Sequence, residues 1–469
     1  MANPISIQGA ANQDINGVMS GVSWDTLDLT YSFPTSASLY GDSYGLKETE
    51  NNFQSLSPTQ AAVARQVFGM ISSVTNLTFT EVQETSVNHA DLRLARSDAP
   101  EAAWSYFPDA SPEGGDTWFR TSGGWFDSPT AGSYAFYVFL HEILHGLGLK
   151  HGNDPSAFGA MTAGHDSMEY SVTTYRSYVG ASGQYVENET WGYAQTLMMY
   201  DIAALQHMYG ADFSTNGGNT TYQWDPATGQ AFINGQGQGA PGGNRIFMTI
   251  WDGNGIDTYN FSNYGTGLTV DLRPGEWSTA SAAQLAQLGA GHTARGNIAN
   301  ALLYQGDTRS LIENAIGGSG NDQIVGNVAA NDLKGMNGAD RLYGLEGADR
   351  LIGGKGLDVL AGGTGRDVFV FDAKPNKTTN WDRITDFVVK DDTIYIENAV
   401  FSKVGKSGKL AGGAYWTGSK AHDASDRVFY NKKTGALSYD PDGTGHLASI
   451  KFAQLDKGLK MTAADFFLT

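Results

Sequence analysis

The first part of the chain, residues 1 to about 212, carries the hydrophobic patterns of a mixed α and β domain. The segments LDLTYSF (27–33) and ADLRLA (90–95) alternate apolar and polar positions, which predicts half-buried strands. The segments SPTQAAVARQVFGMISSV (57–74) and TLMMYDIAALQHMYG (196–210) repeat their apolar positions at helical spacing, which predicts helices. We therefore expect strands and helices that share one core in this part.

From Gly317 onward the hydrophobic pattern becomes a strict repeat of nine residues. Six units follow one another without a gap: GGSGNDQIV, GNVAANDLK, GMNGADRLY, GLEGADRLI, GGKGLDVLA and GGTGRDVFV. The sixth position of each unit is an acid or an amide, namely Asp322, Asn331, Asp340, Asp349, Asp358 and Asp367. The eighth position is always apolar, namely Ile324, Leu333, Leu342, Leu351, Leu360 and Phe369. This nonapeptide is typical of a calcium-binding parallel β-roll.

The chemistry of each repeat unit fits that interpretation. Glycines let the turn adopt left-handed backbone angles, and the turn carbonyls and the carboxylate offer the hard oxygen atoms that calcium prefers. A flexible glycine-rich linker is the alternative, but it does not account for six apolar positions in phase. We expect the unit of Asn331 to bind calcium poorly or not at all. The predicted calcium ligands in the repeats are Gly318, Gly320, Asp322, Gly338, Asp340, Gly347, Asp349, Gly356, Asp358, Gly365 and Asp367.

The last part of the chain returns to ordinary strand patterning, as in WDRITDFVVKDDTIYI and DRVFYNKKTGALSYDPDGTG. The segment ADFSTNGGNTTY (211–222) has the composition of a boundary loop. We therefore expect three regions: residues 1–212, residues 213–375 with the roll, and residues 376–469 as a β-rich closure of the roll.

Composition narrows the possible functions. The chain has 469 residues and a formal net charge of −19, and this acidity argues against a nucleic-acid partner because phosphate binding needs a basic face. It contains no cysteine, which excludes disulfides, zinc–thiolate sites and thiol catalysis. We find no apolar run long enough to span a bilayer, and we expect no membrane insertion. The opening MANPISIQGAANQD lacks the basic and apolar regions of a secretory signal.

Three of the chain's nine histidines lie between His141 and His151, in the segment HEILHGLGLKH. On a helix the apolar positions Phe136, Leu140, Ile143 and Leu147 form one packing seam, and the first two histidines, one turn apart, lie on the other side. Two imidazoles at this spacing can hold one zinc ion from a rigid backbone. Gly148 lets the chain leave the helix, so that His151 can supply the third ligand. Three protein ligands leave one position open, which is typical of catalytic zinc.

Glu142 lies beside the predicted ligands and is the natural general base for hydrolysis of a peptide bond. A single histidine on an apolar helix is usually a core residue. The joint occurrence of His141, Glu142, His145, Gly148 and His151 favours catalytic zinc over that alternative.

With this motif and the glycine repeats in one chain, the protein resembles the serralysin family, metzincin endopeptidases secreted by Gram-negative bacteria. The segments that carry the resemblance are LDLTYSFPTS, LTFTEV, GGDTWFR, YDIAALQHMYGAD, TIWDGNGIDTYNFS and IENAIGGSGND. The resemblance implies an α+β metzincin-like catalytic domain followed by an all-β domain, a parallel β-roll and β-sandwich. It also implies a secreted zinc-dependent endopeptidase that is stabilised by calcium.

The resemblance assigns Tyr175, within EYSVTTYRSY, to a position near zinc, where it can coordinate the metal or stabilise the oxyanion. The chain departs from the family at Thr173, where the family has a methionine. Met168 and Tyr170 in SMEY are an alternative match, but the flanking residues fit Tyr175 better. Loss of the methionine is expected to soften the hydrophobic base under the histidines.

The resemblance further implies calcium ligands before the regular repeats, at Gly218, Thr220, Asp252, Asp257 and Glu313. Substrates of similar enzymes lie as an added strand along a sheet edge, here AAWSYF with Ala103, Trp104, Ser105 and Tyr106. The ending ADFFLT resembles a type I secretion signal, so the implied partners are protein or peptide substrates and the type I secretion apparatus. We expect a monomer outside the cell.

Two other functions remain as alternatives. Thr173 motivates a catalytically weak or inactive calcium-binding RTX protein, either an adhesin or a protease scaffold. A pore-forming repeat toxin would need an apolar or amphipathic membrane segment, which the sequence does not contain.

Overall fold

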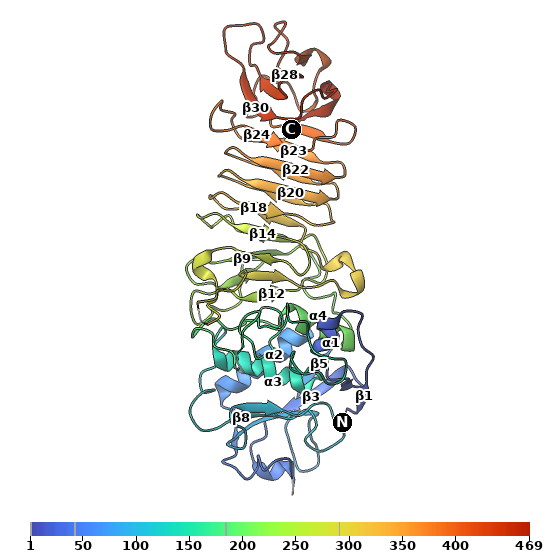
Figure 1. Cartoon of the computed structure of the whole chain (residues 1–469), viewed down its shortest axis with the longest axis vertical. Helices are drawn as coiled ribbons and strands as arrows, with labels where there is room; N and C mark the ends of the chain where they lie inside the picture. The colour runs from blue at the N-terminus through green and yellow to red at the C-terminus, as the bar shows by residue number, and fades with distance from the viewer. Residues whose placement is uncertain (1, 42–43, 183–184, 290) are drawn as a thin grey trace.

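The computed structural model describes residues 2–41, 44–182, 185–289 and 291–469. Figure 1 shows an elongated molecule whose helices gather at the N-terminal end, followed by a long stack of strands that reaches the C-terminal end. The predicted α+β domain followed by an all-β parallel roll is confirmed.

The N-terminal half is built on a mostly parallel sheet. Its strands lie in the order β5 (Thr78–Glu81), β3 (Asp28–Ser32), β6 (Leu92–Ser97), β8 (Thr117–Arg120) and β7 (Ala103–Ser105), and β4 (Gln54–Ser55) also pairs with β6. The strand β7 is antiparallel to β8 and forms an edge of the sheet. Separately, β1 (Pro4–Ser6) pairs with β2 (Val22–Trp24).

Helices supply the rest of this core. The helices are α1 (Gln13–Gly17), α2 (Pro58–Ser72), α3 (Tyr134–Gly146) and α4 (Met199–Tyr209). The start of α2 is fixed by a capping box between Ser57 and Gln60, as its Ser-Pro start predicts. Residues 135–146 of α3 are all buried, so this helix crosses the core instead of lying on the surface. A helix surrounded in this way holds its side chains in fixed positions, which a metal centre requires.

The roll consists of two facing sheets whose strands run parallel through the repeats and include antiparallel pairs toward the ends of the sheets. The larger sheet runs β11 (Gln236–Gly237), β10 (Ala231–Ile233), β9 (Thr221–Trp224), β13 (Thr258–Asn260), β17 (Asn314–Ile316), β19 (Asp332–Lys334), β21 (Arg350–Ile352), β23 (Val368–Phe371), β25 (Thr393–Ile396), β31 (Phe466–Leu468) and β26 (Gly408–Lys409). The other runs β14 (Thr269–Asp271), β18 (Gln323–Val325), β20 (Arg341–Glu346), β22 (Val359–Thr364), β24 (Asp382–Ile384), β30 (Ile450–Gln454), β29 (Ala436–Tyr439), β28 (Val428–Asn431) and β27 (Tyr415–Thr417).

Successive repeat units alternate between the two sheets, so neighbouring strands in one sheet are two units apart in the sequence. Leu342 of β20 therefore lies opposite Ile324 of β18 and Leu360 of β22. The apolar eighth positions of all six units have no exposed surface. Each coil thus adds one apolar side chain to a thin core between the sheets.

The base of the roll packs on the N-terminal half. The strands β12 (Met248–Ile250), β16 (Ile298–Asn300) and β15 (Trp277–Ser278) form a small sheet there. The side chains of Phe247 and Trp277 belong to the hydrophobic core of the N-terminal half. Within the described residues, the helices are too short or too polar to cross a bilayer.

Candidate functional site

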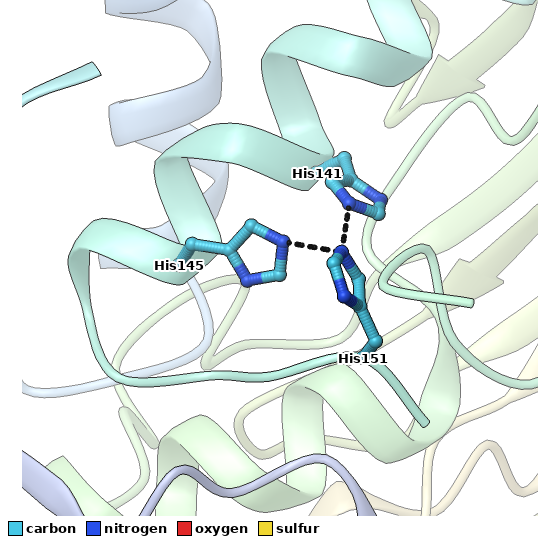
Figure 2. A group of neighbouring side chains, drawn as sticks. All are labelled: His141, His145 and His151. Atoms are coloured by element: carbon cyan, nitrogen blue, oxygen red, sulfur yellow. Dashed lines mark hydrogen bonds between the residues drawn. The ribbon is translucent and has the colours of Figure 1, made fainter. Parts of the chain in front are cut away.

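Three imidazoles converge at the end of α3, as Figure 2 shows. His141 and His145 project from the last turns of the helix, and His151 returns to them from the loop that follows. The Nε2 atom of His151 lies 3.1 Å from Nε2 of His141 and 3.0 Å from Nε2 of His145. Tetrahedral coordination at zinc–nitrogen distances of 2.0–2.1 Å places ligand nitrogens about 3.3 Å apart. The spacing of these nitrogens therefore suits one zinc ion.

Backbone carbonyls hold two of the rings in place. Nδ1 of His141 lies 2.7 Å from the carbonyl oxygen of Val172, and Nδ1 of His145 lies 2.7 Å from that of Leu149. Since a carbonyl oxygen only accepts, each Nδ1 carries the proton, and a neutral ring then presents a lone pair at Nε2. Facing lone pairs repel each other unless a cation lies between them. The donor set therefore fits a divalent metal.

Burial keeps these three rings neutral. It holds the pKa of His141 well below its usual value, and lowers the pKa of His145 to about 4 and that of His151 to about 3. The neighbouring imidazoles act in the same direction on His141 and His151. Metal binding thus requires no loss of protons from the rings at neutral pH.

Gly148 makes the return of the third histidine possible. Its φ of 100° is a left-handed conformation, and a Cβ atom at this position would lie 2.2 Å from the carbonyl oxygen of Val22. Only glycine is accommodated there without strain. The following residues run beside the N-terminal segment, where the amide of Ser20 donates to the carbonyl of Gly148 and Met19 forms a bridge with Leu149.

Glu142 is buried beside the imidazoles, with 6% of its surface exposed. Its Oε2 atom has no hydrogen-bond partner among the described residues. Burial raises the pKa of its carboxyl group to about 8. A carboxyl group of this kind can accept a proton and release it again near neutral pH.

Tyr175 lies against the third histidine, with its ring centroid 4.1 Å from that of His151. Burial, and then the nearby Glu142, raises the pKa of the phenol to about 12, so it stays protonated and can donate a hydrogen bond. Sequence reasoning missed Tyr137, one turn before His141. Its hydroxyl donates to the carbonyl of Thr174 at 3.0 Å and lies 3.2 Å from Nδ1 of His141.

The turn that carries Tyr175 is fixed by a buried aspartate of α4. Asp201 accepts hydrogen bonds from the amide of Val172 at 2.8 Å and from the hydroxyl of Ser171 at 2.6 Å. The hydroxyl of Thr173, which has no exposed surface, lies 2.9 Å from that of Ser171. Thr173 thus joins a polar network next to Val172, whose carbonyl oxygen accepts from His141, at the position where the resemblance implies a methionine.

The predicted substrate strand coincides with β7 at the edge of the sheet. The side chains of Trp104 and Tyr106 both donate to the carboxylate of Glu48, whereas Ser105 bonds Thr117 of β8. Phe107 follows the strand with 41% of its surface exposed, and its ring centroid lies 5.7 Å from that of His145. The strand thus leads directly to the imidazoles.

In the roll the aspartates of the repeats form two ladders. The Oδ1 atoms of Asp340, Asp349, Asp358 and Asp367 each accept the amide of the residue eighteen positions earlier. These bonds join the amide of Asp322 to Asp340, Asp340 to Asp358, Asn331 to Asp349 and Asp349 to Asp367, at 2.8–3.0 Å. Oδ1 of Asp322 instead accepts the amide of Leu268. The Oδ2 atoms of Asp340, Asp349, Asp358 and Asp367 are buried and have no partner among the described residues.

These crowded oxygens fit a cation. Burial, and then the neighbouring carboxylates Asp358 and Asp322, raises the pKa of Asp340 to about 8, and burial with Asp367 raises that of Asp349 to about 7. The glycines of the turns bring backbone carbonyls to the same side, as at Gly338 and Gly320. Carboxylate and carbonyl oxygens are ligands of calcium. Asn331 differs, because its amide nitrogen donates to the carbonyl of Glu313 and to Asn327.

The ladders extend beyond the repeats. The amide of Asp358 donates to Asp382 at 3.3 Å, and that of Asp367 donates to Asp392 at 3.0 Å. The sequence interpretation missed these two residues because the spacing increases to 24 and 25 residues. One pattern could have found them, since each aspartate stands two residues before a buried isoleucine, Ile384 or Ile394, as in the repeats.

The residues implied before the repeats also lie together. The amide of Thr220 donates to Asp257, the amide of Asp257 donates to Glu313, and the hydroxyl of Thr220 donates to the carbonyl of Gly218. Burial raises the pKa of Asp257 to about 8 and that of Asp252 to about 6. The Oδ2 atom of Asp257 is buried without a partner among the described residues. Like the ladders, this cluster contains buried carboxyl groups with raised pKa values and an oxygen without a partner.

Two family models match the chain. The one described as Matrixin covers residues 41–174, and the one described as Peptidase M10 serralysin C terminal covers residues 211–407. The first contains the three histidines and Glu142, and the second contains the repeats.

Relatives match across both halves. The metallopeptidase AprA of Pseudomonas marginalis is 31% identical over 337 residues, which cover 70% of this chain and 64% of the relative. The metalloprotease AprA of Pseudomonas entomophila is 32% identical, over 71% of this chain and 64% of the relative. Serralysin C of Dickeya chrysanthemi is 31% identical, over 68% of this chain and 64% of the relative. The matched part of the chain thus spans slightly less than two thirds of each relative.

Proposed function

The chain belongs to the serralysin family, and from this premise we propose that it is a secreted zinc-dependent endopeptidase that hydrolyses peptide bonds of extracellular proteins. One observation carries the proposal. Three neutral imidazoles converge on one point, and the buried carboxyl group of Glu142, which has an unpartnered oxygen, lies beside them.

His141, His145 and His151 would hold the zinc ion, and three protein ligands would leave one coordination position for water or substrate. Zinc bound in this way polarises a carbonyl group and lowers the pKa of water to about 7. Glu142 would accept the proton of the attacking water at Oε2 and then deliver it to the nitrogen of the leaving amine. Its unpartnered oxygen leaves it free for both transfers.

Tyr175 would donate a hydrogen bond from its phenolic hydroxyl to the oxygen of the scissile carbonyl as negative charge develops there. A peptide would add to β7 as an antiparallel strand along Ala103, Trp104, Ser105 and Tyr106. Ala103 and Ser105 would supply the backbone partners, because Tyr106 already donates its amide to the carbonyl of Asp116 on the β8 side. The bonds from Trp104 and Tyr106 to Glu48 would keep this edge straight and in register.

Calcium would occupy the gaps between the carboxylates of the roll and those of the Asp252, Asp257 and Glu313 cluster. The unpartnered oxygens and the raised pKa values support this assignment. A roll that needs calcium would fold only where calcium is abundant, which suits a protein exported by a type I apparatus and folded outside the cell.

The decisive experiment replaces the general base. Glu142→Gln should lower the rate of casein cleavage by about 10²–10⁴-fold, because the amide cannot accept a proton. Zinc content, measured by elemental analysis, should match that of the parent. Glu101→Gln, an exposed position outside the site, should cleave casein at the parent rate. Casein cleavage by Glu142→Gln at the parent rate would refute the mechanism.

Thr173 supports one competing function, a calcium-binding protein with little or no protease activity. Its hydroxyl network replaces the apolar base expected under the histidines. A calcium-loaded protein that contains one zinc ion per chain and clears no gelatin in a zymogram would favour this alternative.

A further inference from the structure

Lys150 is buried immediately before the third histidine, with only 1% of its surface exposed. Its ammonium group donates to three backbone carbonyls. The bond to Gly17 measures 2.7 Å and the bond to Gly159 measures 3.0 Å, and the third acceptor is the carbonyl of Asp154. All three protons of the ammonium therefore have acceptors inside the protein.

The three carbonyls come from segments that are distant in the sequence. Gly17 is the last residue of α1, 133 positions before Lys150, whereas Asp154 and Gly159 belong to the loop after His151. The main chain reinforces this contact, since the amide of Lys150 donates to the carbonyl of Val18 at 2.8 Å. One charged group thus ties the segment that carries His151 to the N-terminal segment and to the loop.

The loop itself, residues 152–165, contains no helix or strand. Side chains of α1 hold it from the same side. Gln13 donates to the carbonyls of Phe158 and Ala160, and Asp14 accepts the amide of Thr162 at 2.7 Å. A loop without secondary structure keeps its position only through such contacts, and the bonds from Lys150 to Asp154 and Gly159 add to them.

We propose that Lys150 is a positioning residue for the zinc centre, in which the ammonium acts as a tethered cation that gathers the three carbonyls and thereby fixes His151. This inference rests on the proposed zinc site and deepens it. Partners that orient a metal ligand typically change metal affinity by about 10–100-fold when they are removed.

Whether removing the Lys150 ammonium slows or accelerates zinc loss distinguishes an electrostatic effect on the zinc ion from a role in positioning His151. A positive charge beside the site repels a zinc ion, so removing it would slow zinc loss if charge dominated. Removing a group that fixes His151 would accelerate zinc loss. The two roles of Lys150 therefore predict opposite results for one variant.

The experiment measures the rate at which zinc passes to an excess of a chromogenic chelator, with calcium present throughout. All variants also carry Glu142→Gln, which prevents self-cleavage and makes the readout independent of activity. Lys150→Met keeps the apolar stem and removes the charge, and it should accelerate zinc loss about tenfold. Lys150→Arg keeps the charge and donors, and it should lie between Lys150→Met and the parent.

Two controls exclude general destabilisation. Val67→Ala opens a cavity in α2, far from the loop in sequence and fully buried, and it should leave the rate of zinc loss unchanged. In Lys150→Ala, propylammonium should restore slow zinc loss by refilling the carbonyl cage, whereas 1-propanol at the same concentration should not. This rescue tests the proposal on Lys150→Ala and therefore remains informative if Lys150→Met folds poorly.

The proposal is overturned if Lys150→Met and Lys150→Arg lose zinc at the parent rate or more slowly, or if propylammonium has no effect on Lys150→Ala. A parent protein that binds no zinc would instead refute the proposed function. A parent that binds zinc but cleaves nothing would leave the role of Lys150 measurable in the same assay.

Discussion

The three-histidine centre and the aspartate ladders both bring candidate metal ligands close together, but the ligand atoms differ in charge. At the histidines the ligand atoms are uncharged, because burial lowers the pKa values of the rings and backbone carbonyls fix two of the Nδ1 protons. In the ladders the candidate ligand atoms belong to carboxylates. Four of these carboxylates have one oxygen bonded to a backbone amide and one without a partner among the described residues, namely Asp340, Asp349, Asp358 and Asp367.

This difference in ligand charge determines how much folding stability each region loses when its metal is absent. Neutral lone pairs at 3.0–3.1 Å repel weakly, and the helix that carries two of them is held by its own core. Buried carboxylates stacked without a cation destabilise the fold strongly unless they take up protons. We therefore expect the N-terminal half to survive loss of its metal and the roll to depend on its metal.

The largest effect should come from removing each metal in turn. A calcium-selective chelator should unfold the roll and abolish most of the β-sheet signal in circular dichroism, because the ladders lose the charges that neutralise them. A zinc-selective chelator should abolish activity and leave the spectrum unchanged. A roll that keeps its spectrum without calcium at pH 8 would remove the contrast between the two regions.

Substitution of a single ladder aspartate should show, on a smaller scale, that the carboxylates destabilise the calcium-free roll and also bind calcium. Asp340→Asn keeps the acceptor for the amide of Asp322 but removes a charge from the stack. We expect the calcium-free protein to become more stable and the apparent calcium affinity to fall by about tenfold, since ligand charge tunes affinity.

The matched control is Asp332→Asn. This aspartate stands outside the ladders, is 41% exposed, and lies 3.3 Å from Arg350. Surface ion pairs of this kind contribute little to stability. Neither the stability of the calcium-free protein nor the apparent calcium affinity should therefore change. Calcium titrations followed by fluorescence, with thermal melts of the calcium-free forms, measure both. Equal effects of Asp340→Asn and Asp332→Asn would contradict a specific role of the ladder carboxylates in calcium binding.

Dependence on pH should sharpen the comparison further. The pKa of Asp340 rises from 3.8 to about 8 in the folded, cation-free roll, so the folded form binds more protons than the unfolded chain between these values. Stability of the cation-free roll should therefore fall as pH rises from about 4 to about 8. Calcium competes with those protons, so its affinity should rise over the same window. Calorimetry in buffers of different ionisation enthalpy should detect proton release on calcium binding, and its absence would contradict the raised pKa values.

The smallest effect should come from Thr173. Thr173→Val keeps the shape of the side chain and removes the hydroxyl that contacts Ser171, which should cost about 1 kcal/mol of the free energy of unfolding. Thr80→Val on the exposed face of β5 serves as the control and should cost nothing measurable. Zinc retention should stay near the parent value, because backbone carbonyls and not Thr173 orient the rings. A tenfold faster loss of zinc would instead make Thr173 part of the support of the centre.

The sequence predicted the parts of the molecule that depend on local spacing. The histidine centre followed from His141, His145 and Gly148 because one helix and one turn bring the ligands together. The roll could be predicted from its nine-residue period because each turn and strand is formed by residues that are close in the sequence. Asp382 and Asp392 were missed because the chain between ladder positions lengthens after the last repeat, although each still accepts a ladder amide, at 3.3 Å and 3.0 Å.

Long-range contacts could not be predicted. The bond from Lys150 to Gly17 joins residues 133 positions apart, and nothing near either residue marks it. Likewise, the bonds from Trp104 and Tyr106 to Glu48 depend on how a distant loop crosses the sheet. Such contacts arise from tertiary packing, in which burial selects partners that no local pattern encodes.

The register of the two facing sheets restricts how the roll can change length. Deleting residues 335–352, two whole units, would bring Asp358 to the amide of Asp322 and Asp367 to the amide of Asn331, so both ladders would reconnect. Deleting a single unit would move every later strand to the opposite sheet and turn the C-terminal part to the other side of the molecule. Duplication and loss in such a gene should therefore be tolerated in even numbers of units, and the length of the roll should vary in steps of eighteen residues.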